Sequence, residues 1–164
     1  MDRYDPQAIE PKWQQVWEAE QAFEPTNDPI EPKSYVLEML PYPSGSLHMG
    51  HMLVYTIGDV QTHFRRRNGA HVLHPMGFDS FGLPAENAAI REGGHPRAIT
   101  ERNIVNIKRS MRRIGWAIAW SRELSTHDPR YYRWQQWLFL KFLERDLAYR
   151  KAAPSGDRAW VRRG

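Results

Sequence analysis

A strand, a loop, a helix and a second strand follow one another early in the chain, and this order constrains the fold more than any other feature. Residues 34–40 read as a mostly buried strand that ends at Pro41. A helix is expected over residues 48–67, and residues 71–76 read as the second strand. Such a strand–helix–strand unit requires parallel strands and favours a right-handed crossover. The sequence therefore predicts an α/β fold.

Apolar residues at helical spacing predict the other elements. One helix is expected over residues 6–23, one over 83–92, one around 104–114, and one after Asp128, a suitable N-cap before Pro129. We expect these helices and the helix 48–67 to bury apolar faces, which are, in chain order, Ile9, Trp13, Val16 and Trp17; Leu53, Ile57, Val60 and Phe64; Ile104, Ile107, Met111 and Ile114; and Trp134, Trp137, Leu138, Phe142 and Leu143.

Composition excludes several classes of site. The 164 residues include no cysteine, which rules out disulfides and cysteine-ligated zinc or iron–sulfur centres. Seven histidines are present, but no acidic residue accompanies a pair of them at a familiar metal-ligand spacing, so we predict no metal site. There is also no apolar run of about 18 residues and no signal-peptide pattern at the start. We expect a cytoplasmic protein that does not enter the membrane.

The modest net charge of +4 hides an asymmetry along the chain. Residues 1–100 hold 8 Lys and Arg against 13 Asp and Glu, whereas residues 101–164 hold 15 against 6. A basic half of this kind suggests a polyanionic partner. The alternative is that these charges belong to solvated helix faces.

The turn after the first strand is the strongest candidate for a ligand site, because ligands of open α/β sheets bind beyond the carboxyl ends of the strands. The following helix directs its free N–H groups and the positive end of its dipole toward that crevice, which suits a phosphate. Gly45 and Gly50 would let the backbone approach a ligand closely. His48 and His51 are three residues apart and should face the same side of the first helical turn.

Two imidazoles at a helix N-terminus can donate hydrogen bonds to phosphate oxygens and stabilise the charge that develops during transfer at phosphorus. The alternative is that His48 and His51 are ordinary polar surface residues. The loop contains neither a Walker motif nor a Gly-x-Gly-x-x-Gly fingerprint, so P-loop and dinucleotide sites are disfavoured.

Two longer blocks extend this interpretation. Residues 40–51, Leu-Pro-Tyr-Pro-Ser-Gly-Ser-Leu-His-Met-Gly-His, resemble the "HIGH" region of class I aminoacyl-tRNA synthetases. Residues 77–86, Gly-Phe-Asp-Ser-Phe-Gly-Leu-Pro-Ala-Glu, resemble a second block of that superfamily. Within it, the Pro-Tyr-Pro-Ser-Gly approach, Phe81, and the segments 121–124 and 131–134 are similar to the leucyl-tRNA synthetase family. The resemblance runs from about Tyr4 to about Pro154.

The resemblance implies a Rossmann-like parallel sheet with flanking helices, forming the N-terminal half of a catalytic domain over residues 1–153. Residues 154–164 are expected to be a basic, poorly ordered tail. The implied activity is leucine activation with ATP, with His48 and His51 as catalytic residues and Mg²⁺ carried on the ATP phosphates. The implied ATP contacts are Pro41, Tyr42, Ser44, Gly45, His48, Gly50 and His51, and the implied leucine contacts are Met39, Leu40, Tyr42 and Asp79.

Two of these roles have structural alternatives. Asp79 could be a turn or cap residue rather than the partner of the leucine ammonium group, and Met39 could belong to the core.

The family's Lys-Met-Ser-Lys-Ser loop is not in this sequence, and neither are the expected editing and anticodon-binding domains. The partners implied are therefore leucine, ATP, tRNA through an incomplete surface, and the remaining C-terminal half of the enzyme. Three functions stay open: a leucine-activating fragment, a related His-x-Gly-His nucleotidyltransferase, and a non-catalytic ATP- or RNA-binding remnant.

Overall fold

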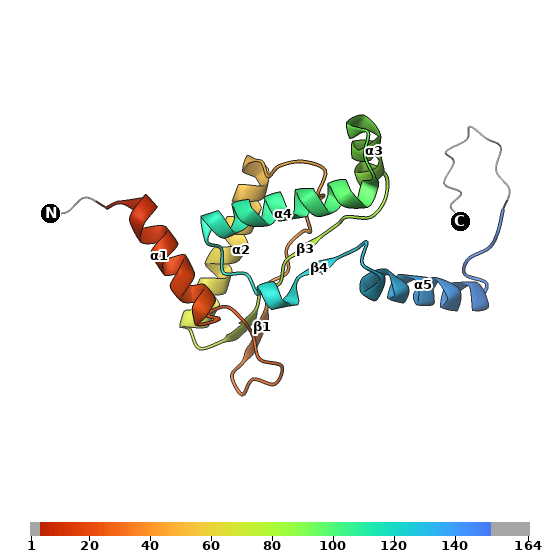
Figure 1. The fold of residues 1–164 in the computed structure, drawn as a ribbon. Coiled ribbons are helices and arrows are strands. Elements are labelled where there is room, and N and C mark those ends of the chain that lie inside the picture. The colour runs from red at the N-terminus through yellow and green to blue at the C-terminus, as the bar shows by residue number, and fades with distance from the viewer. Residues whose placement is uncertain (1–3, 152–164) are drawn as a thin grey trace. The chain divides into compact units, whose positions relative to one another are not determined.

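Residues 4–151 are described in the computed structural model of the chain, and they form two compact units that meet in sequence between Asp128 and Pro129 (Figure 1). The predicted boundary at residue 153 and the predicted tail, 154–164, lie outside the described residues. The second unit contains α5 (Pro129–Glu144). The elements of the first unit are α1 (Pro6–Ala19), β1 (Lys33–Tyr35), α2 (Met49–Arg67), β2 (His71–Leu73), β3 (Gly77–Phe78), α3 (Leu83–Glu92), α4 (Pro96–Ile114), the 3₁₀ helix η1 (Trp120–Arg122) and β4 (Leu124–Ser125).

The first unit contains the predicted strand–helix–strand unit. β1 pairs with β2 in parallel, with Ser34 opposite Val72, and β3 pairs with β4 in parallel, with Phe78 opposite Ser125. The elements therefore confirm the predicted α/β class and the parallel strands. Further backbone hydrogen bonds extend these short ladders, because the Asp79 N–H donates to the Pro41 carbonyl at 3.0 Å. The segment 71–79, called the central segment below, thus runs between two parallel neighbours. The first neighbour contains β1 and the second contains β4.

Both predicted strands are longer than the ladders observed, and Pro75 explains the interruption. The N–H groups of alternate residues in the central segment face the first neighbour, and His71 donates to the Pro32 carbonyl. Pro75 stands at such a donor position and has no N–H, so β2 ends before it and β3 starts after it. From the bond between His71 and Pro32 to the bond between Asp79 and Pro41, the segment that contains β1 advances by one residue more than the central segment. An extra residue of this kind is a feature of a β-bulge. The predicted first helix, 6–23, also ends earlier, at Ala19.

The core of the first unit lies between α2, α4 and the strands. The stripe predicted for α4 is confirmed at Ile104, Ile107 and Met111, which are buried, whereas Ile114 at the last residue of the helix is 39% exposed. Helical spacing therefore identified the inward face of α4 correctly. The cluster consists of Tyr55, Met76, Phe78, Ile104, Ile107, Met111, Trp116 and Ile118.

The inward face of α2 differs from the prediction. The residues expected to be buried, Leu53, Ile57, Val60 and Phe64, are 57–66% exposed. The buried residues of this helix are instead Tyr55, Gly58 and Thr62. Polar tertiary contacts decide this orientation, because Tyr55 donates to the Met39 carbonyl and Gly58 lies against the carboxylate of Glu38. The prediction for this face was wrong. The apolar faces expected on α1 and α5 are not buried either, since neither helix has a buried residue in the described part of the chain.

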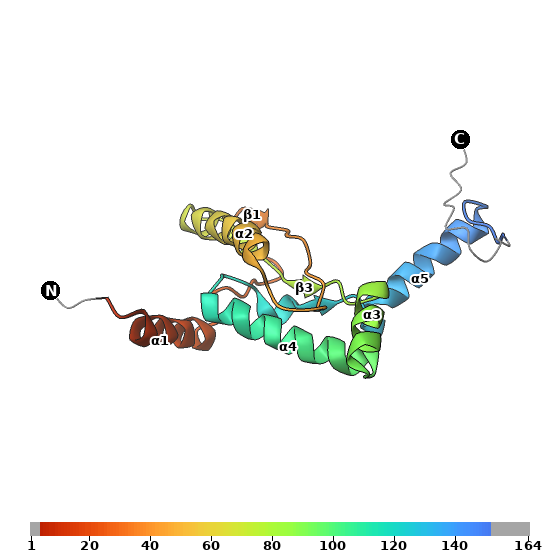
Figure 2. The same cartoon turned by 90° about the horizontal axis from the view of Figure 1, so that it is seen from above.

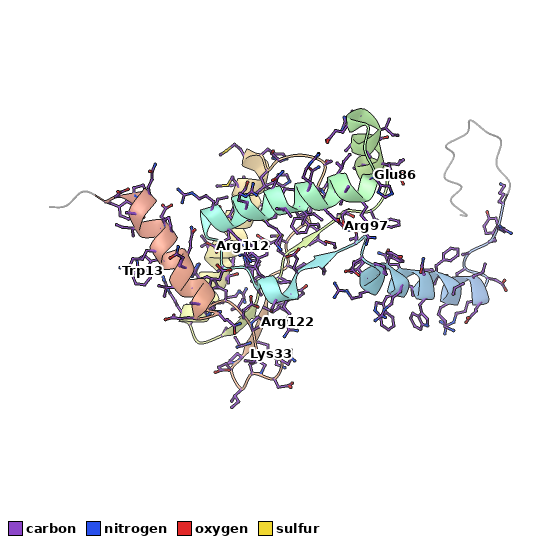
Figure 3. The ribbon with its side chains drawn as sticks, viewed as in Figure 1. Trp13, Lys33, Glu86, Arg97, Arg112 and Arg122 are labelled. Carbon is purple, nitrogen blue, oxygen red and sulfur yellow. The ribbon has the colours of Figure 1, made fainter. Side chains whose placement is uncertain are left out.

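The basic face of α4 is largely paired within the first unit. Arg112 lies 2.8 Å from Glu18 and Arg113 lies 3.4 Å from Glu10, both on α1, and α1 runs beside the C-terminal end of α4 in both views (Figures 1 and 2). Figure 3 marks Arg112 on that end of α4, and Lys108 pairs with Glu123. Exposed ion pairs stabilise little, but they neutralise part of the basic excess. For these residues the solvated-face interpretation is favoured over a polyanion surface.

A buried acid–imidazole pair joins the three strand segments. His74 Nε2 lies 2.8 Å from the Glu38 carboxylate, and His74 Nδ1 lies 2.9 Å from the Ala117 carbonyl. A carbonyl only accepts, so Nδ1 carries a proton and Nε2 shares one further proton with the carboxylate. The other carboxylate oxygen, Glu38 Oε1, is buried without a hydrogen-bond partner among the described residues and lies against Gly58.

Gly58→Ala is expected to destabilise the fold by about 1–3 kcal/mol, because the added Cβ would lie 1.9 Å from Glu38 Oε1 and would displace the buried pair. Urea unfolding followed by circular dichroism measures the change. Gly45→Ala is the matched control, since a Cβ at Gly45 would meet nothing within 4 Å, and it should change stability by less than about 0.5 kcal/mol. Equal stability of the two variants would contradict the packing described.

Candidate active site

Two buried prolines fix the loop between the first strand segment and α2 through hydrogen bonds to their carbonyls. The residues between and after these prolines are exposed to solvent. The buried Pro41 accepts a hydrogen bond from the Asp79 N–H, and the buried Pro43 accepts one from Asn103 Nδ2 on α4 at 2.9 Å. The neighbouring residues Tyr42, Ser44 and Gly45 are exposed. The loop therefore presents side chains and backbone to solvent at the carboxyl end of the parallel strands, where the sequence placed a ligand site.

Two histidines cap the N-terminus of α2 by reciprocal hydrogen bonds. The Gly50 N–H donates to His48 Nδ1 at 3.1 Å, and the His48 N–H donates to His51 Nδ1 at 3.2 Å. The two imidazole rings stack with centroids 3.8 Å apart. This confirms that both side chains lie on the same side of the first turn. The arrangement is a capping box in which imidazole nitrogens replace the usual oxygens.

The caps determine which nitrogen can meet a ligand. A ring nitrogen that accepts an N–H carries no proton, so the neutral imidazoles of His48 and His51 hold their protons on Nε2. Each ring therefore has an N–H donor that the cap does not use. Beside the positive end of the helix dipole, two Nε2–H donors suit the oxygens of a phosphate.

Electrostatics favours the neutral form of His51. Partial burial, and after it the neighbouring His48, lower the pKa of His51 below its usual value. Protonation would also place a hydrogen on Nδ1, which could then no longer accept from the backbone. The capped turn and the lowered pKa therefore have the same consequence, a neutral donor near physiological pH.

The two glycines of the motif have different structural roles. At Gly50, a Cβ would lie 2.9 Å from the His48 ring, so glycine is needed here for the capping imidazole to reach the backbone. At Gly45, a Cβ would meet nothing within 4 Å. The predicted close approach of a ligand remains a prediction at both positions.

Asp79 lies at the same edge, after β3. Its carboxylate accepts a hydrogen bond from Thr126 Oγ1 at 3.3 Å, and the same hydroxyl accepts from the Ser80 N–H at 2.8 Å. The helix that follows has Gly82 as its N-cap, so Asp79 is not a cap of that helix. The hydroxyl of Thr126 has one proton, and the geometry directs it to Asp79. Thr126 therefore fixes the orientation of the carboxylate.

The predicted leucine contacts lie between the strand and the loop. Met39 is 68% exposed, which overturns the alternative that it belongs to the core. Leu40 is half-buried and Tyr42 is exposed. These side chains flank Pro41, which is bonded to the Asp79 backbone. The apolar candidates and the carboxylate therefore lie on adjoining strand ends.

Sequence reasoning did not find several residues that shape this site, namely Tyr55, Asn103 and Thr126. Each acts on a segment at least 16 residues away in sequence, as the separations of their hydrogen bonds show. Helical spacing offered one signal, because Tyr55 is four residues after His51 and so shares its face.

Among residues 4–151, no group of three or more His, Asp or Glu side chains forms a metal-binding cluster. No helix within that range combines the length and the apolar character that crossing a membrane requires.

Comparison with known proteins identifies what this arrangement resembles. Residues 12–155 match the family model of class I tRNA synthetases (I, L, M and V). A leucine–tRNA ligase of Thermosynechococcus vestitus is 57% identical over 152 residues, which are 93% of this chain and 18% of that protein. The leucine–tRNA ligase of Desulforapulum autotrophicum is 53% identical over 150 residues, 92% of this chain and 17% of that protein. The chain thus spans less than a fifth of the length of these relatives.

Solved structures agree. The ternary complex of Agrobacterium radiobacter K84 LeuRS with tRNA and LeuAMS matches 90% of this chain and 19% of that chain, with 44% identity and a TM-score of 0.86. Mycobacterium tuberculosis methionyl-tRNA synthetase in complex with methionyl-adenylate matches 69% of this chain and 22% of that chain, with 25% identity and a TM-score of 0.63. The predicted resemblance and the predicted fold are confirmed, and a more distant nucleotidyltransferase is disfavoured.

The lowered pKa of His51 predicts how stability depends on pH. The unfolded chain binds a proton at this residue more readily than the folded one, so the stabilisation is present above about pH 6.5 and is lost as the pH falls through the lower folded pKa. In His51→Gln the third helical residue still accepts the N-cap N–H, but it does not titrate. Urea unfolding between pH 7.5 and pH 5 should show a smaller loss of stability in this variant than in the unsubstituted chain. Identical pH profiles would contradict the assignment.

Proposed function

The chain belongs to the family of class I tRNA synthetases (I, L, M and V), and we propose that it forms the part of a leucine–tRNA ligase that binds ATP and leucine and joins them as leucyl-adenylate. The observation that carries this proposal is the pair of Nε2–H donors at the capped N-terminus of α2, next to the strand ends that hold Asp79. The sequence identity of 53–57% with leucine–tRNA ligases supports leucine as the amino acid.

ATP is proposed to bind along the loop and the first turn of α2. The Nε2–H groups of His48 and His51 donate to phosphate oxygens, and the helix N-terminus adds its positive dipole end. Gly45 leaves the backbone accessible, and Gly50 makes room for the capping His48 ring. Pro41, Tyr42, Ser44 and Gly50 are the further residues proposed to line the approach. Mg²⁺ is proposed to enter as part of the substrate, on the ATP phosphates.

Leucine is proposed to bind at the adjoining strand ends. The carboxylate of Asp79 pairs with the substrate ammonium group, a charge-assisted hydrogen bond of the stronger kind. Met39, Leu40 and Tyr42 supply apolar surface for the side chain. A pocket of this type separates amino acids that differ by one methylene by only about 1–3 kcal/mol, so selectivity against valine should be modest.

In the proposed reaction a leucine carboxylate oxygen attacks the α-phosphorus of ATP. A new O–P bond forms, the bond from the α-phosphorus to the bridging oxygen breaks, and pyrophosphate leaves with the electron pair. No proton is transferred in this step, so the residues of the site contribute positioning and charge stabilisation rather than acid–base chemistry. The two Nε2–H donors act where negative charge is redistributed.

Transfer of leucine to tRNA is proposed for the whole ligase, in which this chain would act with the remaining C-terminal half. The second candidate function is a non-catalytic ATP- or RNA-binding fragment. Because the Lys-Met-Ser-Lys-Ser loop is not in the sequence, the phosphate contacts that this loop makes in the family would have to come from elsewhere, which favours that candidate over full activity of the chain by itself.

Exchange of labelled pyrophosphate into ATP separates the two functions. With each proteinogenic amino acid tested in turn, exchange should depend on leucine. Asp79→Asn should raise the KM for leucine about 10- to 100-fold, because a charged hydrogen bond to the ammonium group is lost. Asp28→Asn, in the exposed connector before β1, is the matched control and should change nothing. ATP binding without leucine-dependent exchange would leave only the second candidate.

His48→Asn tests the histidines without removing the helix cap, since asparagine is a preferred N-cap residue. Stability should stay within about 0.5 kcal/mol, while loss of the Nε2 donor lowers the rate of exchange about 100-fold. His95→Asn makes the same substitution at the N-cap of α4 and should leave the rate unchanged. If exchange survives in a chain carrying both His48→Asn and His51→Ala, the proposed roles of the two histidines are wrong.

A further inference from the structure

We propose that Tyr55 is a positioning residue that fixes the ATP-binding side of the site relative to the leucine-binding side. The inference rests on the proposed function, because it assigns the two sides by the ligands proposed for them. Tyr55 lies on the inward face of α2 and is 1% exposed. It contacts His51 with its ring and Met39 with its hydroxyl, and these two residues belong to different halves of the site.

The ring contact sets the position of His51. The rings of Tyr55 and His51 are stacked, with nearly parallel planes at 15° and centroids 5.8 Å apart. Trp116 packs edge-on against the phenol ring, with ring centroids 5.4 Å apart and ring planes at 76°. The Trp116 indole N–H donates to Thr56 Oγ1. Trp116 therefore holds the Tyr55 ring in place independently of His51. The fixed phenol ring limits how far the His51 imidazole can move toward the core.

The hydroxyl contact sets the position of the strand end. Tyr55 donates to the Met39 carbonyl at 2.9 Å. The side chain of Met39 is largely exposed, and its backbone lies in the stretch between the ladder of β1 and the bond at Pro41. The phenol hydroxyl is therefore a direct link between α2 and the backbone that carries the proposed leucine contacts.

The hydroxyl keeps its proton throughout the working range of pH. Burial, and after it the charge of Glu38, raise the pKa of Tyr55 well above its usual value. A phenol that stays protonated always donates to a carbonyl, so the link to Met39 does not depend on pH. Phenylalanine would keep the ring and lose only this link.

The two contacts can be separated by substitution. Tyr55→Phe removes the hydroxyl and retains the ring beneath His51, so it should affect only the leucine side. Tyr55→Leu removes both contacts and should affect both sides. Tyr35→Phe is the matched control, since Tyr35 is an exposed tyrosine of β1 outside the site.

The first measurement is pyrophosphate exchange at varied leucine and varied ATP, on variants shown by circular dichroism to be folded. Tyr55→Phe should raise the KM for leucine about three- to tenfold, the equivalent of one hydrogen bond, with the KM for ATP and kcat unchanged. Tyr55→Leu should raise both KM values. A Tyr55→Phe variant that changes both KM values equally, or neither, overturns the proposal.

The second measurement is independent of catalysis and distinguishes failure of this inference from failure of the proposed function. In NMR spectra of the free chain, Tyr55→Phe should shift the Met39 carbonyl resonance and leave the lowered His51 pKa in place, whereas Tyr55→Leu should let the His51 pKa rise toward its usual value as burial decreases. Absence of exchange in the unsubstituted chain would count against the proposed function alone. An unmoved Met39 carbonyl in Tyr55→Phe, or an unmoved His51 pKa in Tyr55→Leu, overturns the positioning role.

Discussion

The buried imidazole of His74 links three strand segments of the first unit. His74 bonds to Glu38 on the preceding strand segment and to the Ala117 carbonyl on the segment that follows α4. Burying an acid and an imidazole costs desolvation, which their close hydrogen bonds offset. The contact also determines where α2 lies, because Gly58 is the residue whose lack of a side chain admits the Glu38 carboxylate.

The site is formed where the strand segments end beyond that pair. The bond between the Asp79 backbone and Pro41 brings two strand ends together, and Asn103 on α4 holds Pro43. The N-terminus of α2 is capped by the two histidines that are proposed to contact the ATP phosphates. The same two side chains therefore satisfy helix N–H groups and keep their Nε2 donors unused by the cap, so the proposed phosphate binding would depend on the residues that stabilise the helix end.

The outward face of α2 shows the limit of periodicity as a guide. Its stripe of Leu53, Ile57, Val60 and Phe64 has the spacing of a buried face, yet these residues are exposed in the first unit. The helix buries a tyrosine, a glycine and a threonine instead. Apolar spacing identified α4 correctly because its inward residues pack on apolar neighbours, whereas specific polar contacts determine the inward face of α2.

The sequence alone determined the α/β class, the strand–helix–strand unit, the parallel strands and the placing of His48 and His51 on one side of a helical turn. These follow from local spacing and from the chain order of the elements. Only the tertiary structure decided the inward face of α2, the break in the central segment's ladder and the residues that orient the site, Tyr55, Asn103 and Thr126. Their partners lie 16 to 60 residues away in sequence, and no local pattern encodes which distant carbonyl or carboxylate a side chain will meet.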